Sequence, residues 1–546
     1  MRYSHRPRAW DILIAGAAFA IYIWTSPLRD LYGLEARTAL LARQMLEGGA
    51  SFFPMIFGKV YPDYNPLYFW LEALFSLPSG HISTFTAVLP SALCAAGLVI
   101  LTLRLGYEIS ARTGFLSAMV LAVTPGFWIE ASHATIDMTL ALCVGVSILC
   151  LFLMDRGRRT SHIIFYVLAV SCAFLTKGPL GLVLPCVVWG GYLLSYRRIK
   201  DLLSFSFFMG IFGAALIGLE AGLAWHKGGG TLVREIIESQ VTGRVGEEAN
   251  NSIFYYPLFL AKGFGIWWIW MAAWAVAALR SKTFAIKSLA GAVSANKIIR
   301  LLLIWLGSVL IIFSLASSRH GRYLLPLFPA IAVLLGLSVE KIAAMSIPGR
   351  RWPYERIIDV TLGVLLIVGL ASALRPPFSL VTPISLVVIW AAVIIAGRVT
   401  ISKLAAKELR LAVLASWLLV CGLSGYGLIF EPAISRAESG KELAAKAEHG
   451  LDKTTPIIIY GIRQDGDGVK YALYSQRPSS ELKFIPRLVG DYEGLKYILP
   501  ARFMLVGYEK DILSLEKATK GIFYFDAVSK GTIHRRECLA AMVTNK

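Results

Sequence analysis

Apolar runs long enough to cross a lipid bilayer recur along the chain almost to residue 430. A helix needs about 20 apolar residues to span the hydrocarbon core, where its backbone must satisfy its own hydrogen bonds. The runs are continuous rather than alternating, which argues against a transmembrane barrel. Because 56% of the 546 residues are hydrophobic and only 16% are charged, a soluble domain is excluded too. We therefore predict an α-helical, polytopic membrane protein.

Thirteen runs are predicted as membrane spans, the first of them an uncleaved N-terminal segment. The predicted spans are residues 10–28, 82–103, 113–127, 135–154, 162–175, 178–195, 203–225, 255–279, 299–316, 323–339, 357–374, 379–397 and 409–430. A further apolar stretch, residues 65–77, is short and contains Glu72. We expect this stretch to lie at the membrane interface or to re-enter the membrane.

The basic residues set the expected orientation. A net charge of +19 would suggest nucleic acid in a soluble protein. Here Lys and Arg gather in alternate short loops such as "DRGRRTSH" and "SYRRIKD", which is what the positive-inside rule describes for cytoplasmic loops. We therefore expect a cytoplasmic N-terminus, no nucleic-acid partner and, with thirteen spans, an extracytoplasmic C-terminus.

Three segments on the outer side are long, namely residues 29–81, 226–254 and 431–546. The last is less apolar: "ELAAKAEHGL" is typical of a helix, "PIIIYG" and "RFMLVGYE" of strands, and "GIRQDGDG" of a turn. We predict a membrane domain over residues 1–430 and a small α/β domain over residues 431–546.

The first outer segment is rich in groups that could carry chemistry. An amphipathic helix is expected over residues 34–47, and it carries Glu35 and Arg37. An extended stretch with proline follows, and its polar residues are Lys59, Tyr61, Asp63 and Tyr64. These residues alone leave two interpretations open, a charged interfacial loop or the rim of a site.

Asp137 begins an otherwise apolar span, at the outer end, close to Glu130 and His133. An ionisable residue in such a place is a functional candidate. The plainer interpretation is an acid in the first helical turn, where it favours the helix dipole. His133 and Asp137 are four residues apart, so a metal site on one helix face is a weak alternative, and Asp63 is an equally weak metal ligand.

Several cations also stand on the outer side, where the positive-inside rule does not require them: Lys177, Arg319 and Arg322, with Arg244 in the second outer segment. They could bind an anion or extend toward lipid headgroups. Together with the acids they would suit transfer from a lipid-linked phosphate. Cations would hold the leaving phosphate, and a carboxylate would accept the acceptor's proton.

Five segments, taken in order, resemble bacterial membrane glycosyltransferases of the GT-C class, of the aminoarabinose (lipid A-modifying) transferase and protein O-mannosyltransferase kind. They are "LEARTALLARQMLEGG…GKVYPDYNPLYFWL", "IDMTLAL", "LTKGPLGLVLP", "SQVTGRV" and "SSRHGRYLLPLFPA". The resemblance implies an inverting enzyme of the bacterial inner membrane that uses polyprenyl-phosphate-linked sugars on the periplasmic face. It also implies a sugar acceptor such as lipid A, lipopolysaccharide or another envelope glycan, and a monomer.

By position in this family, Glu35, Arg37, Tyr61, Asp63, Asp137 and Arg244 match motif residues, and Tyr64 stands where the family has a lysine. Catalytic roles are expected of Glu35, Asp63 and Asp137. With the outer cations added, donor-phosphate or substrate binding is expected of Arg37, Lys59, Tyr61, Tyr64, Lys177, Arg244, Arg319 and Arg322. The histidine that aminoarabinose transferases keep as a metal ligand before the arginine of the second outer segment is missing from "ESQVTGR". No cofactor is therefore firmly expected, although a divalent metal stays open.

Leu34 is the main departure, because it stands where the family has its catalytic aspartate. Either Glu35, Asp30 or Asp63 acts instead, or the acceptor is an already ionised phosphate that needs no base, or the chain is a weak or silent relative. Two further alternatives are a protein O-glycosyltransferase and a transporter for a lipid-linked sugar. A transporter would carry its functional charges near the bilayer midplane, whereas these charges lie at span ends.

Overall fold

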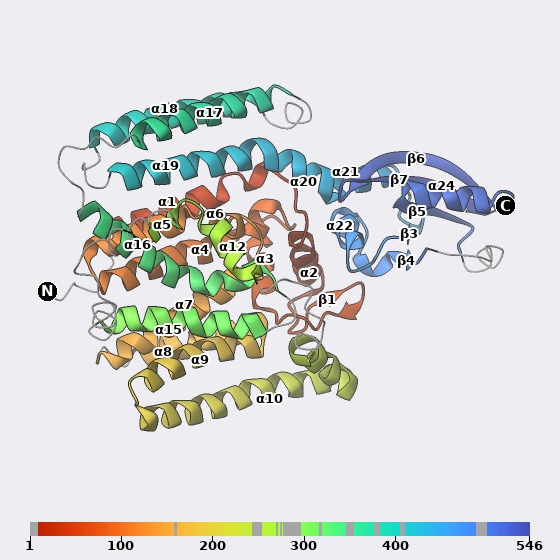
Figure 1. The fold of residues 1–546 in the computed structure, drawn as a ribbon. Helices are drawn as coiled ribbons and strands as arrows, with labels where there is room; N and C mark the ends of the chain where they lie inside the picture. The colour runs from red at the N-terminus through yellow and green to blue at the C-terminus, as the bar shows by residue number, and fades with distance from the viewer. Residues whose placement is uncertain are drawn as a thin grey trace.

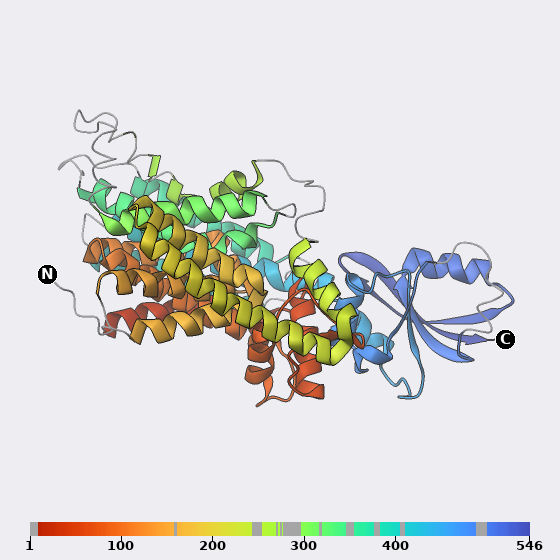
Figure 2. The ribbon, with the colours of Figure 1, turned by 90° about the horizontal axis from the view of Figure 1, so that it is seen from below.

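The computed structural model describes residues 9–157, 161–242, 254–268, 271–272, 276, 296–315, 319–344, 354–375, 383–404, 410–487 and 499–545. A bundle of roughly aligned helices makes up most of the molecule, and a small domain with strands stands at one end of it (Figure 1). Figure 2 shows the same two parts from below, with the chain ends at opposite extremes. We call the two ends of the bundle the domain-side end and the far end.

The bundle packs around one large apolar core that includes Trp128, Trp267 and Trp305, all at most 1% exposed. Its helices are α1 (Ala9–Ile23), α4 (Thr84–Tyr107), α5 (Ala111–Ala122), α6 (Pro125–Ala131), α7 (Ile136–Asp155), α8 (Ser161–Lys177), α9 (Pro179–Ser195), α10 (Ile199–Ile237), α12 (Tyr255–Phe264), α15 (Lys297–Leu315), α16 (Phe328–Ala344), α17 (Tyr354–Ala373), α18 (Ile384–Leu404), α19 (Arg410–Gly425) and α20 (Glu431–Ser439). Short 3₁₀ turns, η1 (Ser26–Leu28) and η3 (Gly321–Leu327), precede the first outer segment and α16.

Each predicted span overlaps at least one helix of the described residues, and the prediction of a helical membrane fold is confirmed. Among the described residues, eight helices are long and apolar enough to cross a membrane, or nine if the pair α5 and α6, bent by 63°, is one span. The helices α8 and α9 have only 17 residues each. The count of thirteen crossings therefore stays a prediction, and much of the predicted span 255–279 lies outside the described residues.

The first outer segment folds at the domain-side end. It contains α2 (Glu35–Gly48), the hairpin β1 (Met55–Ile56) and β2 (Lys59–Val60), and α3 (Leu67–Ser76). The helix predicted over residues 34–47 is thus present. Its apolar side packs on α3, and α3 in turn packs on α4.

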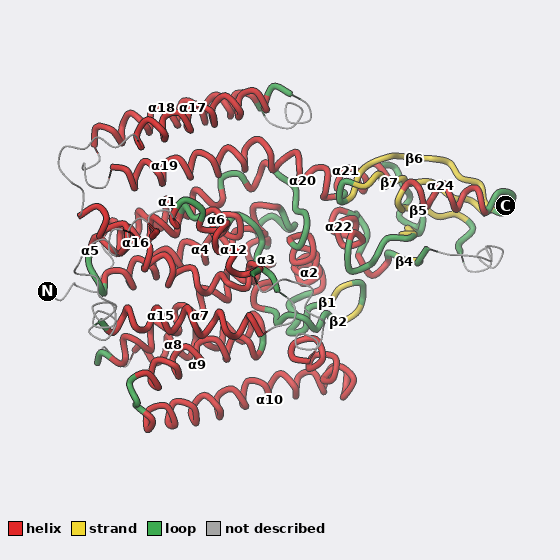
Figure 3. The backbone as a smooth tube through the Cα atoms, in the orientation of Figure 1, coloured by secondary structure: helices red, strands yellow, loops and turns green. Residues whose placement is uncertain are grey.

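The C-terminal domain is an α/β domain, as the sequence indicates. Its sheet has the order β4–β3–β5–β7–β6, with β3 parallel to β4 and β5 and the remaining pairs antiparallel. The strands are β3 (Ile457–Tyr460), β4 (Lys483–Ile485), β5 (Arg502–Tyr508), β6 (Phe523–Ile533) and β7 (Arg536–Asn545), and the helices are α21 (Lys441–Ala447), α22 (Asp467–Tyr474) and α24 (Glu509–Ala518). Figure 3 shows that the described strands lie only in this domain and in the hairpin.

The C-terminal domain and the first outer segment share one core. Leu40 of α2 and Tyr471 of α22 are buried in the same apolar cluster. The Arg43 guanidinium donates to the carbonyls of Leu473 at 3.0 Å and Ser475 at 2.8 Å, and so caps the end of α22. The last membrane helix continues past the predicted boundary at residue 430 to Ser439, so one continuous helix connects the two parts.

Candidate functional site

Three charged side chains from distant parts of the chain meet at the domain-side end of α7. Asp137 Oδ1 forms an ion pair with Lys177 Nζ, and Asp137 Oδ2 lies 3.1 Å from Arg322 Nε. The Asp137 and Lys177 side chains are 4% and 1% exposed, and that of Arg322 is 19% exposed. The sequence named all three residues as candidates, but not that they pair.

Helix ends place these groups. Asp137 lies in the first turn of α7 and Lys177 is the last residue of α8, so each charge favours the dipole of its helix. Gly178 follows with a φ of +58°, and a Cβ on it would stand 2.1 Å from Gln240 Oε1. Glycine is therefore required where the second outer segment closes over the end of α8.

Two tyrosines complete the cluster. Lys177 Nζ lies 4.2 Å from the centroid of the Tyr323 ring and 5.9 Å from that of Tyr64. The Arg322 guanidinium lies 5.6 Å from the Tyr323 ring centroid. Cations over aromatic faces are held without being neutralised. We call these five residues the α7 charge cluster.

In the α7 charge cluster two cations lie against the carboxylate of Asp137, and Glu130 is a second acid near Arg322. A buried charge is costly unless it is paired, and here Lys177 and Arg322 share one carboxylate. The two cations are thus held close together, where they could bind a phosphate through charge-assisted hydrogen bonds. It is suited to holding an anion at the end of the bundle.

A second group connects this cluster to the C-terminal domain. Arg37 Nη1 donates to the Tyr61 hydroxyl at 3.1 Å, and Arg37 Nη2 donates to the Asp465 carbonyl. The Tyr61 ring lies 6.2 Å from the Tyr64 ring. Burial, together with the carboxylate of Asp63, raises the pKa of Tyr61 above its ordinary value. Arg37, Tyr61 and Asp63 thus lie together on one side of Tyr64.

Glu35 occupies a different place from the one its motif suggests. Its carboxylate oxygens accept from Arg29 at 2.6 and 2.8 Å, and one also accepts from the Ala134 amide at 2.7 Å. Although burial alone would raise the pKa of Glu35, the Arg29 charge and these hydrogen bonds hold it below its ordinary value. A carboxylate engaged in this way is poorly placed to accept a substrate proton.

The metal alternative finds little support in the geometry. His133 lies in the loop before α7 rather than on its helical face, so the expected shared face with Asp137 is wrong. Its Nε2 lies 2.9 Å from Glu431 and 3.2 Å from the Tyr32 hydroxyl. Within the described ranges, no three His, Cys, Asp or Glu side chains gather as a metal site. The mechanism proposed below therefore uses no metal.

The remaining candidates are scattered. Lys59 is exposed on β2, and Arg319 Nη2 donates to the carbonyl of Ser314, at the end of α15, at 3.3 Å. Arg244 lies outside the described residues. Leu34 precedes α2 and is 50% exposed. Its side chain has no polar group that could contact either cation of the cluster.

Sequence reasoning missed Tyr323, Arg29 and Glu431. Tyr323 directly follows a candidate in "RHGRYLLP", and aromatic neighbours of a buried cation are a usable signal. Glu431 is an acid at the end of the last apolar run, which is also a signal. Arg29 had none, because an arginine just after a span resembles an interfacial anchor.

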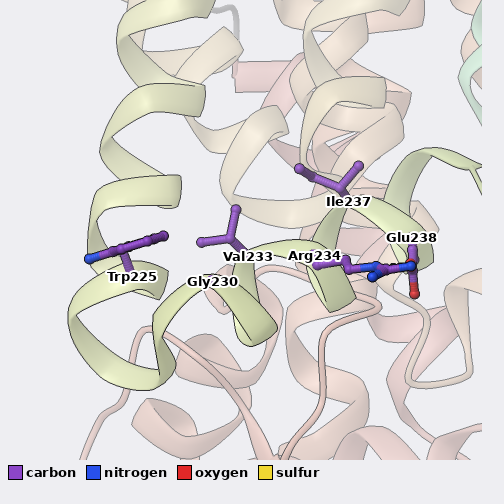
Figure 4. Close-up of a pocket in the computed structure, with 6 residues that line it drawn as sticks. All are labelled: Trp225, Gly230, Val233, Arg234, Ile237 and Glu238. Atoms are coloured by element: carbon purple, nitrogen blue, oxygen red, sulfur yellow. Dashed lines mark hydrogen bonds and ion pairs between the residues drawn. The ribbon is translucent and has the colours of Figure 1, made fainter.

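A hollow of about 400 Å³ lies elsewhere, at the domain-side end of α10 (Figure 4). It is lined by Trp225, Gly230, Val233, Arg234, Ile237 and Glu238. Its charged groups pair with each other, Arg234 Nε to Glu238 Oε1 at 2.7 Å, and are largely exposed. None of the α7 charge cluster lines it, so we do not place the chemistry there.

Comparison with known proteins finds matches in the families that the sequence motifs resemble. Residues 62–225 match the family model described as dolichyl-phosphate-mannose-protein mannosyltransferase. The chain is 26% identical over 403 residues to undecaprenyl phosphate-alpha-4-amino-4-deoxy-L-arabinose arabinosyl transferase 1 of Pseudomonas fluorescens, covering 70% of this chain and 69% of that relative. A second relative, undecaprenyl phosphate-alpha-4-amino-4-deoxy-L-arabinose arabinosyl transferase of Pseudomonas aeruginosa (strain UCBPP-PA14), is 26% identical over 344 residues. These residues are 61% of this chain and 59% of that relative.

The fold has a solved counterpart. The structure of ArnT from Cupriavidus metallidurans bound to undecaprenyl phosphate superposes with a TM-score of 0.72 and 18% identity, over 97% of this chain and 98% of that one. The resemblance to the aminoarabinose transferase and O-mannosyltransferase families is therefore confirmed in sequence and in fold.

Proposed function

We propose that this chain is a glycosyltransferase that moves a sugar from a polyprenyl-phosphate donor to an envelope acceptor on the periplasmic face of a bacterial inner membrane. The α7 charge cluster carries the proposal, because it brings the buried Lys177 and the partly exposed Arg322 together at the end of a membrane bundle. The relatives' names and the undecaprenyl phosphate bound to the similar solved structure support this class of donor.

In this mechanism Lys177 and Arg322 hold the donor phosphate, and Asp137 fixes the two cations. The acceptor attacks the anomeric carbon from the face opposite the phosphate, so the configuration inverts. The bond from that carbon to the phosphate oxygen breaks, and the phosphate leaves with an added negative charge. Cations already in place for that charge stabilise the transition state without reorganising.

The acceptor's proton decides what else the site must do. Of the acids near Leu34, Glu35 is held by Arg29 and Asp30 lies 2.8 Å from Lys441. Asp63, beside Tyr61, is the candidate base for a hydroxyl acceptor. We favour an ionised phosphate of lipid A or lipopolysaccharide, which needs no base and so tolerates leucine at position 34.

The orientation follows from the same proposal. The domain-side end, with the C-terminal domain, would face the periplasm, and the donor would enter sideways from the lipid. We propose a monomer, since the α7 charge cluster is complete within one chain. A hydroxyl on a protein is the second candidate acceptor, supported by the family model that matches residues 62–225.

The test is a transfer assay with the full chain in membranes. Labelled undecaprenyl-phosphate sugars are offered with lipid A or with a protein extract, and products are identified by mass spectrometry. We expect labelled lipid A with the wild type, a loss of at least tenfold with Arg322→Gln, and normal transfer with the control Arg300→Gln, whose guanidinium lies 4.2 Å from the Tyr196 ring centroid at the far end. Labelled protein alone would favour the second acceptor. Movement of the donor across the bilayer without any transfer would refute an enzyme.

A further inference from the structure

A buried network of charges holds the segment that leads into α7. Arg29 binds Glu35 with both terminal nitrogens, and Arg29 Nε lies 3.2 Å from Glu431 Oε1. The side chains of Arg29, Glu35 and Glu431 are 1%, 5% and 0% exposed. We call Arg29, Glu35, Glu431 and His133 the Arg29 network.

The Arg29 network binds three consecutive residues. Arg29 Nη2 donates to the Ser132 carbonyl at 2.8 Å, His133 Nε2 lies 2.9 Å from Glu431, and the Ala134 amide donates to Glu35 at 2.7 Å. This segment leads straight into α7, whose first turn carries Asp137. The path of this segment therefore fixes the position of the Asp137 side chain.

The same network reaches the C-terminal domain. Glu431 begins α20, the helix that leads from α19 of the bundle to α21 of this domain (Figure 1). Asp30, next to Arg29, receives Lys441 of α21 at 2.8 Å, and its amide donates to Ser435 of α20 at 3.1 Å. We call the start of α20 at Glu431 the root of the C-terminal domain. Arg29 thus contacts both this root and the loop before α7.

We propose that Arg29, Glu35 and Glu431 are positioning residues through which the root of the C-terminal domain sets the place of Asp137 between Lys177 and Arg322. This inference rests on the proposed function for its kinetic readout. None of the three touches substrate. A shift of about 1 Å in a reacting group can cost about 100-fold in rate, and the network holds the residues that lead into the first turn of α7.

A merely structural role makes a different prediction, and the chain offers a matched control. Glu448 is also a buried acid of the C-terminal part, accepting from the Tyr471 hydroxyl at 2.9 Å and the Gln476 amide at 2.8 Å. It has no contact with residues 132–134 among its described bonds. Glu431→Gln and Glu448→Gln both remove a buried carboxylate, but only the first disturbs the loop before α7.

The experiment compares these two variants in the full chain by kcat, donor KM and melting temperature. Both should melt earlier than the wild type. Only Glu431→Gln should lower kcat at least tenfold, with the donor KM within about twofold, because donor binding is kept and its alignment is lost. A kcat for Glu431→Gln equal to that of Glu448→Gln would overturn the proposal.

Two additions keep the test decisive. If Glu431→Gln does not fold, Tyr32→Phe removes only the hydroxyl 3.2 Å from His133. It should lower kcat severalfold, whereas Tyr508→Phe, which loses a bond to Asp467, should not; equal rates would count against the proposal. If the wild type transfers no sugar, the proposed function fails by itself, and positioning is read from Lys177 modification by an amine reagent. Glu431→Gln should speed that modification and Glu448→Gln should not, while equal rates would overturn positioning.

Discussion

The two ends of α7 carry the same kinds of residue in different surroundings. At the domain-side end Asp137 meets Lys177 and Arg322, whose side chains are 1% and 19% exposed. At the far end Asp155 meets Arg198 and Lys297, whose side chains are 38% and 52% exposed. Tyrosines accompany both, Tyr192 at the far end with a hydroxyl 3.4 Å from Asp155.

Solvent separates the two ends. Exposed cations are screened by water and contribute little to stability, about 0–1 kcal/mol per pair, so the far end needs no function to explain it. At the domain-side end Lys177 is buried and Arg322 is only partly exposed, so little water screens their charges. The same kinds of residue therefore form an interfacial anchor at one end of α7 and a candidate phosphate site at the other. The predictions below test that difference.

The largest difference should appear in transfer by the two lysines. Lys177→Met removes a cation from the leaving phosphate, and loss of one such group costs about 100- to 1000-fold in kcat, or about 3–4 kcal/mol. Lys297→Met, at the far end, should stay within about twofold of the wild type. Initial rates with labelled donor measure both. Equal rates would remove the distinction between the ends.

Stability should separate the two aspartates. Asp137→Asn removes the carboxylate that pairs with both Lys177 and Arg322, and should lower the free energy of unfolding by about 3 kcal/mol. Asp155→Asn leaves exposed cations and should cost about 1 kcal/mol or less. Thermal melting in detergent compares the two. An Asp155→Asn variant as unstable as Asp137→Asn would mean that burial does not distinguish the ends.

Leu34→Asp sharpens the account of the domain-side end. If the acceptor is ionised, a new carboxylate at this half-exposed position has no proton to accept, and activity should stay within about threefold of the wild type. Initial rates with lipid A and with a protein extract measure it. A large gain with a hydroxyl acceptor would favour the second candidate acceptor, and a large loss would show that residue 34 is not aligned with the family's aspartate.

A small pH effect should belong to the domain-side end alone. Burial opposes the charge on His133, but the carboxylates of Glu35 and Glu431 prevail over it and over Arg29, and raise the pKa of His133. The fold therefore favours the charged form of His133. The side chains of Tyr32 and Glu130 also face this histidine. That stabilisation is complete below the ordinary histidine pKa of about 6.5 and is lost as pH rises through the raised value.

The melting advantage of the wild type over His133→Gln should therefore shrink from pH 6 upward. The far-end variant Asp155→Asn serves as the control, and its difference from the wild type should not change in that way. An advantage of the wild type over His133→Gln that grows with pH would contradict the assignment.

The sequence predicts more of the fold than of the site. Apolar runs locate the described bundle helices other than α20, because burial in lipid demands continuous hydrophobicity. Asp137, Lys177 and Arg322 were identifiable as charges at span ends, but their pairing depends on segments separated by up to 185 positions along the numbering, from 137 to 322. Glu35 looked catalytic from its motif, and only the tertiary position of Arg29 shows that its carboxylate is already engaged.

The central claim is that Lys177 and Arg322 hold the phosphate of a polyprenyl donor, whereas the far end does not. Equilibrium binding of labelled undecaprenyl phosphate to the purified chain tests this without any transfer. We predict saturable binding by the wild type and by Lys297→Met, and binding at least tenfold weaker by Lys177→Met. Equal affinity for all three proteins would contradict the account.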